Sequence, residues 1–119
     1  MEHRSLGTSD LELSVFGLGT MTFGAEADET TSHAILDRFV EDGGTFIDTA
    51  DVYTRGASEE IIGSWLANRG GPEGLTIATK ARFPMSDDPG DRGAGRAHLE
   101  QAVDASLSRL GVDVIDLYQ

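Results

Sequence analysis

The stretch that decides the fold is Gly44-Thr45-Phe46-Ile47-Asp48-Thr49-Ala50-Asp51-Val52-Tyr53, near the middle of the 119-residue chain. Residues 45–47 form a short run of β-branched and aromatic side chains that follows two glycines, and such a run indicates a buried strand. Residues 48–53, which include the polar side chains of Asp48, Thr49, Asp51 and Tyr53, then lie at the carboxyl end of that strand. In a parallel α/β barrel, residues in that position face the active site.

Three more apolar runs predict buried strands on either side of this stretch, at residues 13–18, 75–79 and 112–118. Apolar residues at helical spacing between the runs predict three helices, at residues 29–42, 58–68 and 96–110. Glycines follow each of these helices, and Ser58 is the predicted N-cap of the second. Residues 4–11 are predicted to add a small N-terminal β-hairpin.

This order predicts a parallel sheet with right-handed crossovers, and two α/β architectures share that feature. A doubly wound nucleotide-binding domain requires a glycine-rich phosphate loop, but residues 17–24 do not match G-x-G-x-x-G. The alternative is the N-terminal part of a (β/α)8 TIM barrel, whose full form takes roughly 250 residues. We therefore expect residues 1–119 to form an incomplete barrel domain without its C-terminal half.

The composition, 39% hydrophobic and 25% charged, is that of a globular protein. The net charge of −12 argues against a nucleic-acid partner, because neutralising phosphates requires clustered Lys and Arg. The chain has no cysteine, and no apolar run approaches the ~20 residues of a membrane span. These features predict a cytoplasmic protein that binds neither nucleic acid nor membrane.

Lys80 is the sharpest chemical signal, because it is the only lysine and directly follows a predicted strand. A cation at a dry barrel mouth needs a carboxylate partner, and Asp48 ends the neighbouring strand at the same level. An ammonium group near the Tyr53 hydroxyl favours the phenolate, so Tyr53 is predicted to act as a general acid. This set suits protonation of a carbonyl oxygen while hydride reaches the carbon, and it needs no metal.

Each of these residues also has an ordinary structural interpretation. Asp48 alone is typical of a helix cap, Tyr53 of loop packing, and Lys80 of a surface cation. Their occurrence at successive strand ends favours catalysis. Asp51 and Arg55 are predicted to be solvated loop charges, and the three histidines lie in the tail or on helices rather than at strand ends.

The first strand ends at Gly19-Thr20-Met21, and the glycines around it have two interpretations. They permit a tight turn, or they let a flat cofactor ring approach the backbone of Gly19 and Thr20.

Taken together, these motifs resemble those of the aldo-keto reductases, and the resemblance runs from about Arg4 to Gln119. The pattern is most similar to the bacterial and potassium-channel-β-subunit-like branch. The motifs that carry it are residues 17–24, 44–53, Ser58-Glu59-Glu60-Ile61-Ile62-Gly63, Ile77-Ala78-Thr79-Lys80 and 107–119.

The resemblance implies NADPH-dependent reduction of a small-molecule aldehyde or ketone, with Tyr53 as proton donor and Lys80 and Asp48 tuning it. The family's fourth catalytic residue, a histidine, belongs two residues beyond Gln119. The residues implied to line the wall against the nicotinamide are Gly19, Thr20, Met21 and Asp48.

Most of the family's remaining cofactor and substrate pocket belongs to later strands, so this chain is expected to be inactive alone. Two alternatives to a catalytic role stay open. The chain is either a truncated product or half-barrel that associates with a partner through its exposed barrel edge, or part of a cofactor-sensing regulatory barrel.

Overall fold

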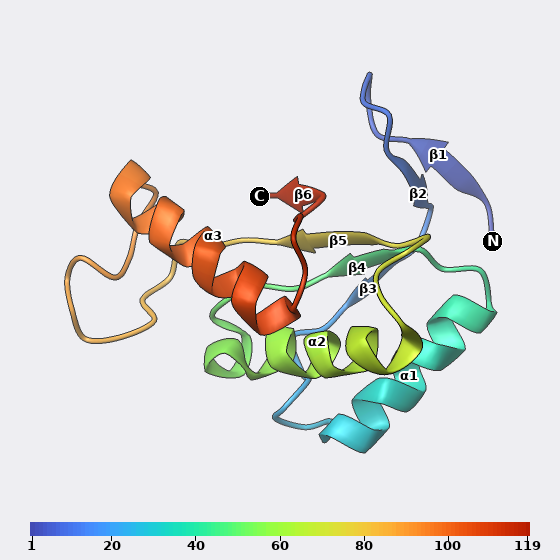
Figure 1. Cartoon of the computed structure of the whole chain (residues 1–119), viewed down its shortest axis with the longest axis horizontal. Helices are drawn as coiled ribbons and strands as arrows, with labels where there is room; N and C mark the ends of the chain where they lie inside the picture. Colours follow the sequence, from blue (N-terminus) through green and yellow to red (C-terminus); the bar gives the residue numbers. More distant parts are fainter.

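A four-stranded parallel sheet forms the centre of the computed structural model, which describes all 119 residues (Figure 1). The strand order follows the chain, and the register sets Gly19, Asp48 and Ala78 side by side across three neighbouring strands. The carboxyl ends of the strands therefore meet at one edge of the sheet. The strands are β3 (Gly17–Gly19), β4 (Phe46–Asp48), β5 (Thr76–Thr79) and β6 (Leu117–Tyr118).

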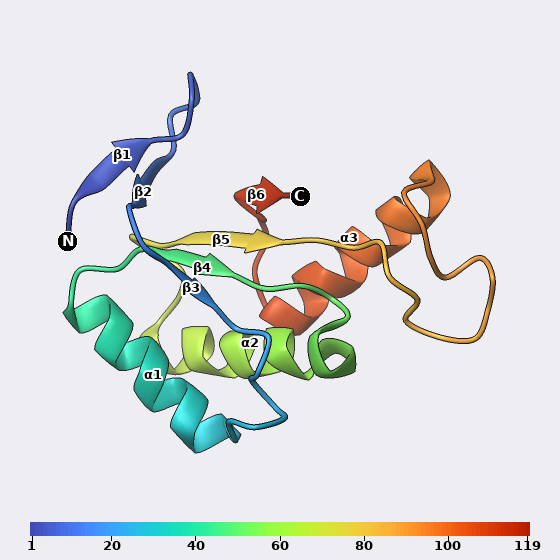
Figure 2. The same cartoon turned by 180° about the vertical axis from the view of Figure 1, so that it is seen from behind.

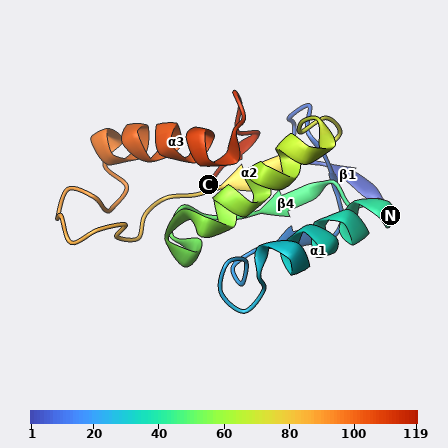
Figure 3. The same cartoon turned by 60° about the horizontal axis from the view of Figure 1, so that its bottom comes forward.

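Three α-helices connect these strands and lie on one face of the sheet (Figures 1 and 3). They are α1 (Glu29–Glu41), α2 (Ala57–Arg69) and α3 (Arg96–Leu110), with a 3-10 turn, η1 (Tyr53–Gly56), before α2. Because no helix lies on the other face, the doubly wound alternative is excluded. None of the three helices combines the length and apolar character that crossing a membrane requires.

The hydrophobic core lies between the sheet and the helices. Ile47 and Ile77, on the two central strands, are fully buried against it. The other core residues come mainly from the helices and from the segment before α1; they are Phe23, Ala27, Leu36, Ile61, Ile62, Trp65, Leu66 and Leu110. The sheet and helices are thereby fixed relative to each other, which positions the strand ends.

The N-terminal hairpin differs from the prediction. It pairs β1 (His3–Ser5) with β2 (Glu12–Ser14), so the strand predicted at residues 13–18 is in fact divided between the hairpin and β3. The Ser14 hydroxyl causes the division by donating to the carbonyl oxygen of Phe16 (2.7 Å), which bends the chain. Figure 2 shows the hairpin near the end of the sheet where the strands begin, away from the candidate site.

Two further predictions need correction. Ser58 is not an N-cap, because α2 begins at Ala57 and its cap is Gly56, whose positive φ of 95° suits glycine. The strand predicted at residues 112–118 is limited to β6 at its end. The Asp116 carboxylate accepts a hydrogen bond from the Ile77 amide (2.8 Å), so a side chain takes the place of strand pairing just before β6.

Candidate active site

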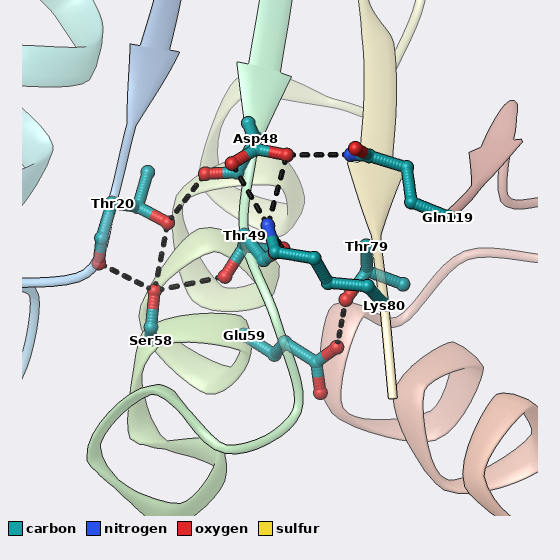
Figure 4. A network of polar contacts seen from close by, with 8 residues as sticks. All are labelled: Thr20, Asp48, Thr49, Ser58, Glu59, Thr79, Lys80 and Gln119. Atoms are coloured by element: carbon teal, nitrogen blue, oxygen red, sulfur yellow. Dashed lines mark hydrogen bonds and ion pairs between the residues drawn. The ribbon is translucent and has the colours of Figure 1, made fainter. Parts of the chain in front are cut away.

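Lys80 and Asp48 meet where β4 and β5 end (Figure 4). The Lys80 ammonium donates to both carboxylate oxygens of Asp48, at 2.9 and 3.1 Å, and to the carbonyl oxygen of Thr49 at 2.9 Å. All three contacts lie on one strand and its extension. The ammonium is therefore held at a defined position by its neighbours rather than extending into solvent.

Tyr53 begins η1, and its ring lies beside this ion pair: the Lys80 nitrogen is 5.0 Å from the ring centroid. This distance is within the range of a cation–π contact. Partial burial alone would lower the pKa of Lys80, but Asp48 and the Tyr53 hydroxyl outweigh it and raise the pKa above its usual 10.5. Lys80 therefore carries its positive charge throughout the neutral range.

The backbone that presents Tyr53 is strained. The next two residues, Thr54 and Arg55, have left-handed φ values of 50° and 52°, which cost side-chain-bearing residues roughly 1–2 kcal/mol each. The Thr54 hydroxyl anchors this turn by donating to the carbonyl oxygen of Phe23 (3.0 Å). The turn leads the chain directly from the site into α2.

A network of buried hydroxyl groups supports the strand ends from behind (Figure 4). The Ser58 hydroxyl lies 2.9 Å from both the carbonyl and the hydroxyl oxygen of Thr20 and 3.0 Å from the Thr49 hydroxyl. The Thr20 hydroxyl in turn lies 3.0 Å from the carbonyl oxygen of Asp48. The network thus fixes the backbone at residues 48–49, the same segment that holds Lys80.

The residues predicted to line a cofactor wall divide into two groups. A Cβ atom built on Gly19 would meet nothing within 4 Å, and Met21 is 65% exposed, so the surface at these residues is open. Thr20 is fully buried, with both its amide and its hydroxyl directed at the Asp48 carbonyl oxygen. Thr20 therefore supports the ends of β3 and β4 from within, while Gly19 and Met21 leave open surface beside them.

A pocket of about 280 Å³ adjoins Tyr53 and Lys80. Sequence reasoning missed four of its lining residues, Ala81, Arg82, Phe83 and Gln119. The Gln119 amide donates to the Asp48 carboxylate at 2.6 Å, so the fourth strand also contributes to the site. The strand-end rule that selected Lys80 would have found Gln119 if it had been applied to the last predicted strand.

Two acidic residues behind the site are buried, and the sequence did not reveal this. Glu59 is fully buried; one of its carboxylate oxygens accepts from Arg109 on α3 and the other from Thr79 on β5, each at 2.6 Å. Asp51, predicted to be solvated, is only 1% exposed and lines a pocket together with residues of α3. Arg55 is exposed, as predicted.

Comparison with models of protein families matches residues 15–119 to the aldo/keto reductase family. The chain belongs to this family. The (β/α)8 barrel prediction is confirmed as well, because the whole chain superposes on 39% of aldo-keto reductase AKR11C1 from Bacillus halodurans (holo form), with a TM-score of 0.85 and 40% identity. The fold described above is the N-terminal part of that barrel.

Similar aldo/keto reductase sequences include oxidoreductases from bacteria and fungi. The chain is 44% identical to the uncharacterized oxidoreductase YqkF of Bacillus subtilis over 123 residues, covering 100% of this chain and 38% of that relative. It is 37% identical to the norsolorinic acid reductase stcV of Emericella nidulans, covering 97% of this chain and 33% of the relative. The chain thus spans less than two fifths of the length of these relatives.

Proposed function

We propose that this chain supplies the proton-donating part of an NADPH-dependent reductase that converts an aldehyde or ketone to an alcohol. The observation that carries the proposal is the Lys80 ammonium, held by Asp48 and Thr49 beside the ring of Tyr53 at the strand ends. The oxidoreductase and reductase relatives support the reaction class. The cytoplasmic location stays a prediction from the sequence.

Tyr53, Lys80 and Asp48 each have a separate role in the proposed reaction. Tyr53 donates its phenolic proton to the carbonyl oxygen of the substrate, and Lys80 stabilises the phenolate that remains. Asp48 orients Lys80 through two hydrogen bonds. When bound, NADPH supplies the hydride that reaches the carbonyl carbon, and the open surface at Gly19 and Met21 fits a flat nicotinamide ring.

A chimeric barrel tests the proposal directly. Residues 1–119 would replace the matching 39% of AKR11C1 from Bacillus halodurans, so that a complete barrel carries this chain's own site. NADPH oxidation is then followed by absorbance with an aromatic aldehyde. We expect Tyr53→Phe to lower kcat about 10²–10⁴-fold, the usual contribution of a general acid.

The chain's other tyrosine provides the matched control. Tyr118 loses the same hydroxyl in Tyr118→Phe but does not line the pocket beside Lys80, so its chimera should reduce the aldehyde at the unchanged rate. Full turnover by Tyr53→Phe would rule out the proton-donor role. Tight NADPH binding with negligible turnover by the unmutated chimera would favour a regulatory barrel instead.

A further inference from the structure

A second pocket lies behind the candidate active site, between α3 and the loop that precedes it. Its volume is about 270 Å³, and its polar lining residues are Asp51, Asp91, His98, Gln101 and Arg109. Asp51 lines both this pocket and the candidate active pocket, so the two pockets adjoin at this residue. Tyr53 and Lys80 do not line the second pocket, which makes it a separate site.

Two side chains of this pocket are buried without a hydrogen-bond partner, although the Nδ1 atom of His98 lies 3.6 Å from the Asp91 carboxylate, within ion-pair distance. Asp51 is 1% exposed and His98 is 5% exposed. Neither carboxylate oxygen of Asp51 and neither ring nitrogen of His98 has a hydrogen-bond partner within the chain. Buried polar groups are nearly always hydrogen-bonded in folded proteins, so these two residues indicate a ligand that completes their contacts.

The charged side chains that line the pocket indicate whether its ligand is a cation or an anion. Asp51 and Asp91 contribute two carboxylates. The only cationic side chain in the lining, Arg109, is already committed to the buried Glu59 carboxylate at 2.6 Å. Burial and the nearby Glu59 carboxylate raise the pKa of Asp51 and outweigh the Val52 amide, Arg109 and His98, which lower it, so the negative charge of Asp51 is only partly compensated. A positively charged ligand would supply it.

The shape of the pocket selects the kind of cation. The chain holds no group of three or more His, Cys, Asp or Glu side chains arranged for a metal ion, so an organic cation fits better. Met85, Ala102 and Ala105 line the pocket with apolar surface that suits a short alkyl chain. The volume of about 270 Å³ lies just below the range of about 300–1,000 Å³ typical of small-molecule sites, so the pocket suits a small ligand.

We propose that this pocket binds the ammonium group of a small primary amine, with Asp51 as the charged acceptor and His98 as a second acceptor. A neutral imidazole offers one acceptor nitrogen, and an ammonium group offers three donors. The hydrogen bond to Asp51 is charge-assisted and provides most of the affinity. The proposal is independent of carbonyl reduction, since it uses none of the residues that act on the carbonyl.

Titration of the full 119-residue chain with ethylammonium chloride, at a concentration where sedimentation shows the chain to be monomeric and followed by ¹⁵N–¹H NMR, tests this site. We expect saturable shifts of the backbone amides of Asp51 and His98. In Asp51→Asn the dissociation constant should rise about tenfold or more, because a charge-assisted hydrogen bond is lost. Asp104→Asn removes the same charge from an exposed position on α3 and should leave the dissociation constant unchanged.

Further probes separate the alternatives. Tetramethylammonium carries the charge without an N–H donor and should cause no saturable shift at Asp51. Equal shifts with both cations, or unchanged ethylammonium affinity in Asp51→Asn, would overturn the proposal. The absence of saturable shifts would overturn it too, and would leave bound water as the partner of Asp51 and His98. Well-dispersed spectra of each variant establish that it is folded.

Discussion

Lys80 contributes to the fold as well as to the candidate site, because its charge is held by the carboxylate of Asp48. The pKa of Lys80 is raised above 10.5, so its contribution is complete below that pH and is lost as the pH rises through the folded-state value. Lys80→Met should therefore lower the free energy of unfolding at pH 7. The difference from the unmutated chain should shrink above pH 10.5, as measured by urea unfolding at both pH values. A difference that persists unchanged in strong alkali would contradict this.

Asp51 has the opposite effect on stability. Its pKa is raised above 3.8 by burial and by Glu59, so the folded chain holds the proton more tightly than the unfolded chain. The contribution of Asp51 to stability is therefore greatest below pH 3.8, its unfolded-state pKa, and is lost as the pH rises through the folded-state pKa. Without bound amine, Asp51→Asn should stabilise the chain at pH 7 by about 1 kcal/mol, with a smaller gain near pH 4. Thermal unfolding at the two pH values measures this, and Asp104→Asn is again the control.

Single residues were predictable where one strand-end rule applied to them. Asp48, Tyr53 and Lys80 all follow predicted strands, and the structure brings the three together. Asp51 lies in the same stretch, yet it is buried and shares a pocket with residues of α3, which is about fifty residues away in sequence. The immediate neighbours of a residue carry no information about such a contact. The same reason explains why His98 was not recognised as a buried group without a hydrogen-bond partner.

At the scale of elements, Gly63 allows α2 and α3 to pack closely. A Cβ atom at this position would collide with the backbone of α3, at the carbonyl oxygen of Arg109. Gly63→Ala should therefore destabilise the chain by about 1–3 kcal/mol, the usual cost of overpacking, despite alanine's higher helix propensity. Urea unfolding measures the change. Asn68→Ala, at an exposed position on the same helix, should leave the free energy of unfolding unchanged or slightly higher. If both substitutions changed the free energy of unfolding by the same amount, the predicted collision at Gly63 would be wrong.

Helices were easier to predict than strands in this chain. The helix predicted at residues 96–110 coincides with α3, that at 29–42 extends one residue beyond α1, and that at 58–68 is one residue shorter than α2 at each end. Helical spacing persists over many residues, which makes it a robust signal. The run at residues 13–18 contains no glycine or proline at the bend, which is made instead by the Ser14 hydroxyl. Its apolar pattern therefore could not show where one strand ends and the next begins.

For the whole molecule, the exposed face and edges of the sheet are the dominant feature. Helices cover one face only, and β3 and β6 each leave one edge without a partner strand (Figure 1). Phe16 and Val114, 70% and 67% exposed, add uncovered apolar surface. We expect the isolated chain to self-associate, with a weight-average mass that rises with concentration in sedimentation experiments. A stable monomer across the micromolar range would contradict this and remove the need for a partner.

The buried pair of Glu59 and Arg109 has a consequence for how the protein is made. Glu59 leaves the ribosome fifty residues before Arg109, the only cation that pairs with it. Until then, docking α2 against β5 would bury an uncompensated charge, which is strongly unfavourable. We therefore infer that α2 docks stably against β5 only after α3, which carries Arg109, has been synthesised. A chain that ends before Arg109 should accordingly exchange the amide protons of α2 faster than the full chain does.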